Sequence, residues 1–151
     1  MAIHTSLKKG GDDVVAVGDS FLSIGTYELD MVDVAALTFT TADQVLALDL
    51  PADTYWELIQ AECVTALTGI TRIDIGDEDD DDEMVSNAST VTAGTNFTLT
   101  KATHTDGPVV LAASKIYVKV TGTPSTGILR LRYLMGSSVR NPIASYRTYP
   151  N

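Results

Sequence analysis

Apolar and polar residues alternate with a period of two along several short segments of the chain. The alternation is clearest in residues 115–121 and 129–134, and it recurs in residues 45–50, 55–66 and 72–75. A period of two places successive side chains on opposite faces of a β-strand. The pattern therefore predicts strands that each turn one face toward a core.

Residues typical of turns separate these segments. Pro, Gly and Asp interrupt the pattern at residues 51–53, 68–69 and 106–108, and a Gly-Thr-Pro-Ser-Thr-Gly stretch occupies residues 122–127. We expect this last stretch to join two strands as a hairpin. Seven to nine short strands result, which indicates an all-β protein: an antiparallel β-sandwich, jelly-roll-like, with a small barrel as the related possibility.

One segment is compatible with a helix. Residues 53–67 contain several good helix formers, and Asp53 is a suitable N-cap. The segments on both sides have strand character, so a strand is favoured here as well.

The charge is unevenly distributed over this chain of 151 residues, which is the usual size of one domain. The net charge is −10, yet residues 1–9 and residues 136–151 contain bases and no acids, so the segment between them carries −14. We therefore predict a β-sandwich domain at residues 12–136, flanked by an N-terminal arm (1–11) and a C-terminal arm (137–151). A body this acidic repels phosphate, so direct binding of nucleic acid is not expected.

The beginning of the chain has no apolar segment of a signal peptide, and no run of 18 apolar residues occurs. We expect a protein that is made in a cytoplasm and has no membrane partner. The single cysteine, Cys63, lies in an apolar segment and is expected to behave as a small buried hydrophobe.

Seven consecutive acids occupy residues 77–83. Such a run is usually an exposed, solvated loop. The alternative is a site for a divalent cation, because Ca²⁺ prefers several carboxylate oxygens, and Asp77, Asp79 and Asp81 have the spacing of the first EF-hand ligands. An EF-hand itself is excluded, since Asp82 stands where that loop requires glycine.

The residues needed for catalysis are not found together. The two histidines are His4 and His104; the second lies near Asp106 in a threonine-rich segment, without a serine in a nucleophile turn. Two histidines and one cysteine have no spacing typical of zinc ligands. We therefore expect no enzyme activity and no cofactor apart from the possible Ca²⁺.

The C-terminal arm is irregular and rich in residue types that anchor interfaces. Arg140, Tyr146, Arg147 and Tyr149 are the candidate interface residues. The arm is expected either to dock on a neighbouring subunit or to pack on its own domain.

The order of several segments resembles that of small structural proteins of tailed double-stranded DNA bacteriophages. These segments are FTTADQV (39–45), LPADTYW (50–56), the acidic segment after Ile73-Asp74-Ile75-Gly76, and KIYVKVTGTPSTGILRLRYLMG (115–136). The resemblance covers about residues 30–136 and contains no catalytic signature. It implies a capsid decoration, or cement, protein with a jelly-roll or related β-sandwich fold.

The resemblance also implies partners and a location: a homotrimer that binds the major capsid protein on the surface of the virion, after assembly in the host cytoplasm. The alternative is a binding module of a head fibre or tail that adheres through carbohydrate or Ca²⁺. In that case Trp56, Tyr117, Tyr133 and Tyr146 are the candidate platforms for a sugar.

Overall fold

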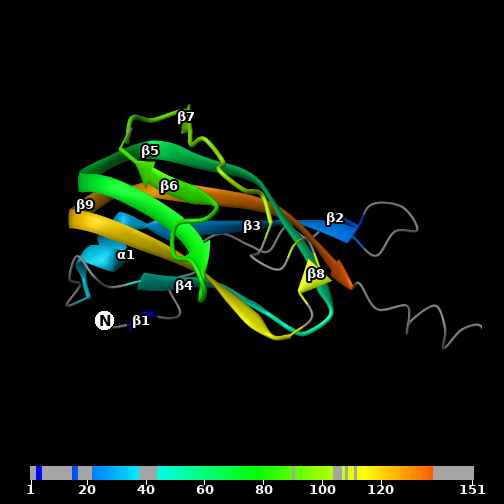
Figure 1. Ribbon diagram of the computed structural model, residues 1–151. Helices are drawn as coiled ribbons and strands as arrows, with labels where there is room; N and C mark the ends of the chain where they lie inside the picture. Colours follow the sequence, from blue (N-terminus) through cyan, green and yellow to red (C-terminus); the bar gives the residue numbers. More distant parts are fainter. Residues whose placement is uncertain are drawn as a thin grey trace, which may run out of the picture.

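A computed structural model describes most of the central part of the chain: residues 3–4, 15–16, 22–37, 44–89, 91–103, 107, 109–110 and 112–137. These residues form nine strands and one short helix (Figure 1). Their bounds are β1 (Ile3–His4), β2 (Val15–Ala16), β3 (Leu22–Asp30), α1 (Met31–Ala35), β4 (Gln44–Leu50), β5 (Thr54–Asp77), β6 (Val85–Ala88), β7 (Thr95–Asn96), β8 (Val109–Val110) and β9 (Ser114–Ser137). The predicted all-β class is confirmed.

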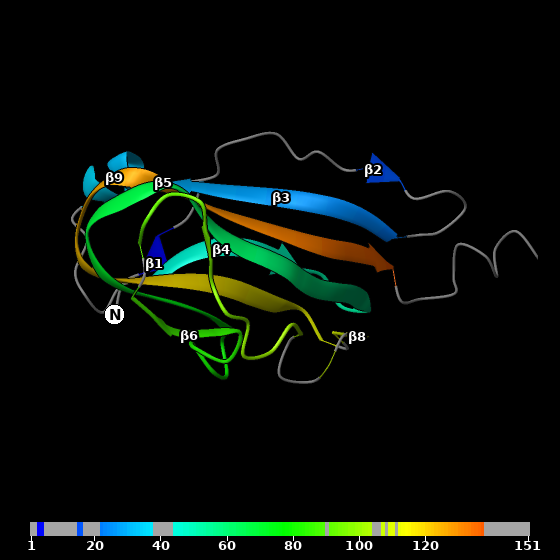
Figure 2. The same ribbon diagram turned by 90° about the horizontal axis from the view of Figure 1, so that it is seen from above.

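Two long strands dominate the fold. β5 and β9 have 24 residues each and pair antiparallel, from Thr54 opposite Ser137 to Asp77 opposite Ile116. This ribbon curls round and returns on itself, as Figure 2 shows at the left of the view. The ribbon thereby contributes strands to two layers.

The remaining strands extend these two layers. The first half of β9 pairs with β4, and the second half pairs with β3, both antiparallel. β1 adds to β4 as a parallel strand, while β6, β7 and β8 pair with β5. The result is one continuous sheet that is folded into a sandwich, and two residues of the predicted N-terminal arm, Ile3 and His4, belong to it.

The expected hairpin at residues 122–127 is wrong. β9 runs through this stretch without a break, and residues 68–69 of β5, which were expected to be a turn, lie opposite it. Gly122 and Gly127 have φ values of 117° and 119°, and the register of the pair shifts several times between Cys63 and Arg72. The glycines therefore bend a strand pair instead of reversing a chain.

Within segment 53–67, residues 54–67 form a strand, as the sequence favoured, and Asp53 lies in the turn before it, but the inward face of the strand changes parity. Trp56 and Leu58 are buried, and so are Ala61 and Cys63. A β-bulge between Leu58 and Gln60 places one extra residue, Ile59, in the strand and leaves it 47% exposed. Alternation along the sequence is preserved on each side of such a bulge and is lost across it.

Buried aliphatic and aromatic residues from both layers form one core. The Trp56 and Tyr133 rings both belong to it and have centroids 6.1 Å apart. The expected burial of Cys63 is confirmed. The largest fully buried side chains are Trp56, Tyr27, Leu29, Met31, Leu50, Leu58, Leu67, Ile73, Ile75, Met84, Ile116 and Leu129.

The helix α1 was not expected from the sequence. It has five residues, too few to show helical periodicity, and begins where the Asp30 carboxylate accepts the Val32 N–H at 2.9 Å. Its Met31 and Val34 side chains are buried in the core. Among the described residues, no helix has the length and apolar character needed to cross a membrane.

Candidate functional site

The acidic segment 77–83 connects β5 to β6 and folds back over the end of β5. The buried Asp77 carboxylate accepts the N–H groups of Asp79, at 2.8 Å, and of Asp80, at 3.0 Å. The Asp77 N–H in turn donates to the Asp80 carbonyl at 3.0 Å. This is the Asx type of turn, in which a carboxylate satisfies backbone donors that would otherwise be unpaired.

The residue before the acids allows the close return of the chain. Gly76 is buried, and a Cβ atom at this position would collide with the Asp80 carbonyl and come within 2.8 Å of the Asp81 Cα. Only glycine leaves space for the loop here. The Gly76-Asp77 pair therefore fixes the loop against the sheet at its first residues.

Basic side chains contact the far part of the loop. Lys119 Nζ lies 2.7 Å from Asp81 Oδ2, and Lys101 Nζ lies 3.2 Å from Glu83 Oε2. The expectation of a purely solvated loop is thus incomplete, because side chains from the sheet and from residues 91–103 hold it. The Lys119–Asp81 pair is partly exposed and contributes little to stability on its own, whereas the Glu83 side chain of the other pair is only 7% exposed.

Three neighbouring residues interact with Asp82. The Ser86 hydroxyl donates to Asp82 Oδ2 at 2.8 Å, the Asp82 N–H donates to Asp80 at 3.3 Å, and Arg72 lies 3.7 Å away. The hydrogen bond from Ser86, followed by that with Asp80 and the nearby positive charges of Arg72 and Lys119, lowers the pKa of Asp82. The loop therefore retains its negative charge at this position under mildly acidic conditions.

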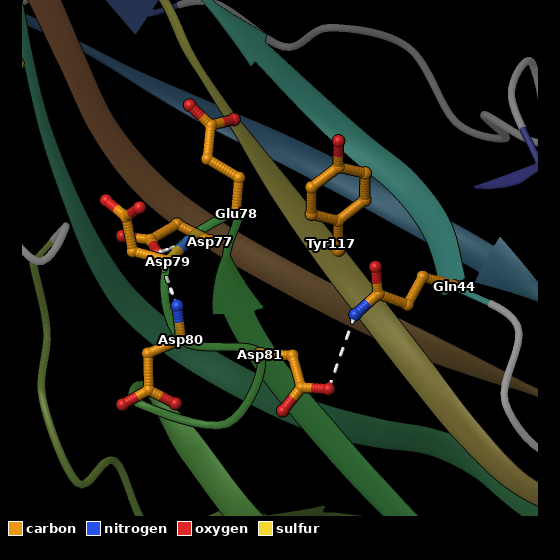
Figure 3. Close-up of a pocket in the computed structure, with 7 residues that line it drawn as sticks. All are labelled: Gln44, Asp77, Glu78, Asp79, Asp80, Asp81 and Tyr117. Atoms are coloured by element: carbon orange, nitrogen blue, oxygen red, sulfur yellow. Dashed lines mark hydrogen bonds between the residues drawn. The ribbon is translucent and has the colours of Figure 1, made fainter. Parts of the chain in front are cut away.

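A pocket of about 390 Å³ opens between the loop, β4 and β9 (Figure 3). Glu78 and Tyr117 stand on one side of it in the view, and Gln44 reaches across toward Asp81, with 3.5 Å between Nε2 and Oδ2. The residues that line the pocket are Gln44, Asp77, Glu78, Asp79, Asp80, Asp81 and Tyr117.

The acids with the spacing of calcium ligands take different positions in this site. Asp77 turns toward backbone amides, Asp79 is exposed at the pocket, and Asp81 contacts Lys119. Three carboxylates whose oxygens lie within 4.8 Å of one another are found instead at Asp80, Asp81 and Asp82. Binding of Ca²⁺ by Asp77, Asp79 and Asp81 stays a prediction.

Other predicted site residues fall outside the described part of the chain. These are the interface candidates Arg140, Tyr146, Arg147 and Tyr149, together with His104 and Asp106. The proposed roles of the C-terminal arm stay predictions.

The aromatic platforms expected for a sugar-binding module are largely covered. Trp56 has no exposed surface, Tyr133 is 3% exposed and Tyr117 is 6% exposed. A sugar stacks on an exposed aromatic face, so Trp56, the best candidate, is excluded as a platform. Tyr146 lies outside the described residues.

Two residues of the pocket, Gln44 and Tyr117, were not expected beside the acidic segment; Tyr117 was considered only as a sugar platform. Tyr117 alternates with the core residues Ile116 and Val118, which assigned it to the solvent face of its strand. The register places Tyr117 opposite Gly76, directly beside the returning loop. The pairing of two segments that lie far apart in the chain could not be inferred from either segment alone.

The fold and the site define an all-β protein made of one sheet folded into two layers, with an acidic loop over its outer side. No family model matches the sequence, and no curated protein matches it either.

Two solved structures are similar to this chain, both with a TM-score of 0.53. One is a chain of the cyanophage Pam1 capsid asymmetric unit, 19% identical over 82% of this chain and 92% of that chain. The other is a chain of the capsid of Ralstonia phage GP4, 14% identical over 91% of this chain and 99% of that chain. At these identities the likeness is one of fold.

Proposed function

We propose that this chain is a structural protein of a phage virion, and more narrowly a capsid decoration (cement) protein on the outer surface of the head. The observation that carries the proposal is the likeness to two chains from phage capsids, which extends over 92% and 99% of their lengths. Both are therefore chains of about this size, and the similarity concerns whole molecules. This favours a small, separate component that accompanies the capsid.

The charge of the protein supports a position on the outside of the head. The net charge is −10, and the acids are concentrated between residues 10 and 135. Packaged DNA presents a dense array of phosphates, which would repel this body. An outer position keeps the protein away from the genome and leaves the shell as its partner.

The architecture suits a component that is repeated many times by symmetry. The strand pair β5–β9 crosses both layers and gives a continuous hydrogen-bonded body. We propose that three copies associate as a homotrimer and bind the major capsid protein, so that weak single contacts are multiplied. Neither catalysis nor a cofactor is required for this role.

Binding to shells that lack this chain tests the proposal directly. Purified protein is mixed with such shells, and the pellet after sedimentation is measured as protein is added. We expect saturable binding at a fixed number of copies per shell, a higher temperature of shell disruption, and a trimer in analytical ultracentrifugation. Shells already saturated with the chain serve as the control and should take up none.

A failure to sediment with shells would contradict the decoration role. Binding to isolated fibres or tails, without binding to shells, would favour the adhesive module of a head fibre or tail. The buried Trp56 argues against a carbohydrate-binding version of that module.

A further inference from the structure

The outer face of one layer carries exposed apolar side chains. β3, the second half of β9 and the first half of β5 lie side by side in this layer (Figure 2). Of the three large hydrophobic residues that are exposed in the described part of the chain, Ile24, at 37%, and Ile59, at 47%, belong to this face. Leu134, which is partly buried, lies on β9 between them. Together they form a patch, in contrast to single exposed apolar residues, which need no explanation.

Four outward side chains on β5 and β9 occupy the corners of a square. Glu57 is the direct partner of Leu134, and Ile59 is the extra residue of the bulge beside Arg132. Leu134 and Ile59 therefore lie on one diagonal, and Glu57 and Arg132 lie on the other. The apolar diagonal continues to Ile24, which is the direct partner of Leu134 on β3.

The two charged corners of the square make no ion pair within the described part of the chain. Arg132 is exposed, and the Glu57 carboxylate accepts the Tyr55 hydroxyl at 2.8 Å. Arg130, two residues away on the same face, differs from Arg132 because it contacts two carboxylates. One positive and one negative group, on opposite sides of an apolar line, are thus available to a partner.

We propose that this face binds the same face of a second copy of the chain, about a two-fold axis that follows the apolar diagonal. Rotation about this axis lays Leu134 and Ile59 of one copy against the same residues of the other, and it exchanges the two charged corners. Arg132 of each copy then meets Glu57 of the other copy. A two-fold contact requires such a self-complementary surface, and here the charges match as well as the apolar residues.

The distribution of charge favours contact between two copies at this face. The chain has a net charge of −10, and its seven consecutive acids, residues 77–83, follow the half of β5 that belongs to the other layer. On the proposed face, two arginines offset most of the charge of Glu28, Glu57 and Glu62. Repulsion between two acidic bodies is therefore small when they approach through this face.

The contact is small, so the pairing should be weak. With three apolar residues and two ion pairs, we expect a dissociation constant of about 0.1 mM, in the range of transient interfaces. Copies at micromolar concentration then remain unpaired. The pairing does not depend on the proposed function, and a homotrimer that uses another face would be joined by it to a neighbouring trimer.

Sedimentation velocity of the full chain, from about 10 µM to about 1 mM, measures the association. We expect the mass of the particle present at low concentration to double as the concentration rises. Ile59→Ser should weaken this association about tenfold or more. Val32→Ser is the matched control, because it removes a similarly exposed apolar side chain from α1 and should leave the association unchanged.

Exchange of the charges tests the two-fold arrangement itself. Arg132→Glu and Glu57→Arg each place like charges against one another in a pair, so neither variant alone should associate at about 1 mM. An equimolar mixture of the two variants should associate again, because each chain then offers the charge that the other lacks. Lys115→Glu makes the same change of charge at an exposed residue of β9 in the other layer and should associate within about twofold of the unchanged chain.

Three results would overturn the proposal. The first is the absence of association of the unchanged chain at about 1 mM. The second is an equal effect of Ile59→Ser and Val32→Ser. The third is a mixture of Arg132→Glu and Glu57→Arg that stays unassociated while the unchanged chain associates. Circular dichroism of each variant verifies that it is folded, and none of these measurements involves a shell, so the outcome is separate from that of shell binding.

Discussion

Tyr27 places its polar hydroxyl group in the core of the protein. It is 1% exposed, and within the described residues its hydroxyl has no hydrogen-bond partner. Burial raises its pKa well above 10.0. A buried hydroxyl without a partner costs free energy, because its hydrogen bonds to water are lost on folding.

Tyr27→Phe should therefore leave the free energy of unfolding unchanged or raise it by about 1 kcal/mol. Urea unfolding followed by circular dichroism measures the difference. A decrease of more than about 1 kcal/mol would contradict this account, since it would mean that the hydroxyl has a stabilising partner, such as a buried water.

Cys63 should be unreactive in the folded protein. Burial raises the pKa of its thiol above 9.0, so the reactive thiolate is scarce. At pH 8 we expect iodoacetamide to modify the native chain much more slowly than the chain in urea, as measured by mass spectrometry. Equal rates would contradict the buried position.

The raised pKa of the Cys63 thiol also makes the free energy of unfolding depend on pH. The fold favours the protonated thiol, so the contribution of Cys63 to stability is complete below pH 9.0 and is lost as the pH rises through the higher pKa of the folded state.

Single residues also show the limit of prediction from the sequence. The acidic run was expected to be exposed, and most of it lies at the surface, but Asp77 is 1% exposed and caps the turn. Nothing in a run of seven acids distinguishes its first member. Its role follows from Gly76 and from the opposite strand, which local patterns do not contain.

At the scale of elements, the bend of the β5–β9 ribbon depends on glycine. Gly127→Ala would introduce both a strained φ of 119° and a Cβ within 2.7 Å of the Leu67 Cα. We expect a loss of about 3 kcal/mol in the free energy of unfolding, from backbone strain and overpacking together.

Gly94→Ala separates these two costs. Gly94 has a φ of 79°, but a Cβ there would meet nothing within 4 Å. It should lose only about 1 kcal/mol, from backbone strain. Equal losses in the two variants, measured by thermal unfolding, would mean that close packing at the bend is unimportant.

An arginine connects three neighbouring strands, β3, β9 and β5. Arg130 on β9 donates to Glu28 on β3 at 2.7 Å and to Glu62 on β5 at 2.9 Å. Arg130→Gln should reduce the free energy of unfolding by about 1 kcal/mol, because the three partly covered charges form a network.

Arg132→Gln is the matched control, since Arg132 lies two residues further along the same face and is exposed, without an ion pair among the described residues. It should change stability by less than about 0.5 kcal/mol. Similar losses in both variants would refute the network, and a dependence on salt for Arg130→Gln alone would support it.

The elements were predicted correctly where alternation is local and wrongly where the chain bends. Strand character in residues 115–121 and 129–134 was evident from the sequence, and both segments are in β9. The glycines between them indicated a reversal, because a bend and a hairpin use the same residue types. The parity change at Ile59 arises from a bulge that the sequence does not mark.

At the scale of the whole molecule, composition and alternation were sufficient for the all-β class, and the resemblance to phage structural proteins agrees with the solved structures of similar fold. The folding of one long ribbon into two layers was not foreseen. It requires Thr54 and Asp77 of one strand to pair with opposite ends of another, which is a long-range property.

The central claim is that this body sits on the outside of a phage head. Electron cryomicroscopy of particles assembled with and without the chain tests it most directly. The account predicts additional density on the outer surface of the shell, in symmetric groups of three, into which the two-layered sheet fits. Density inside the shell or on the tail, or no difference between the two particles, would contradict it.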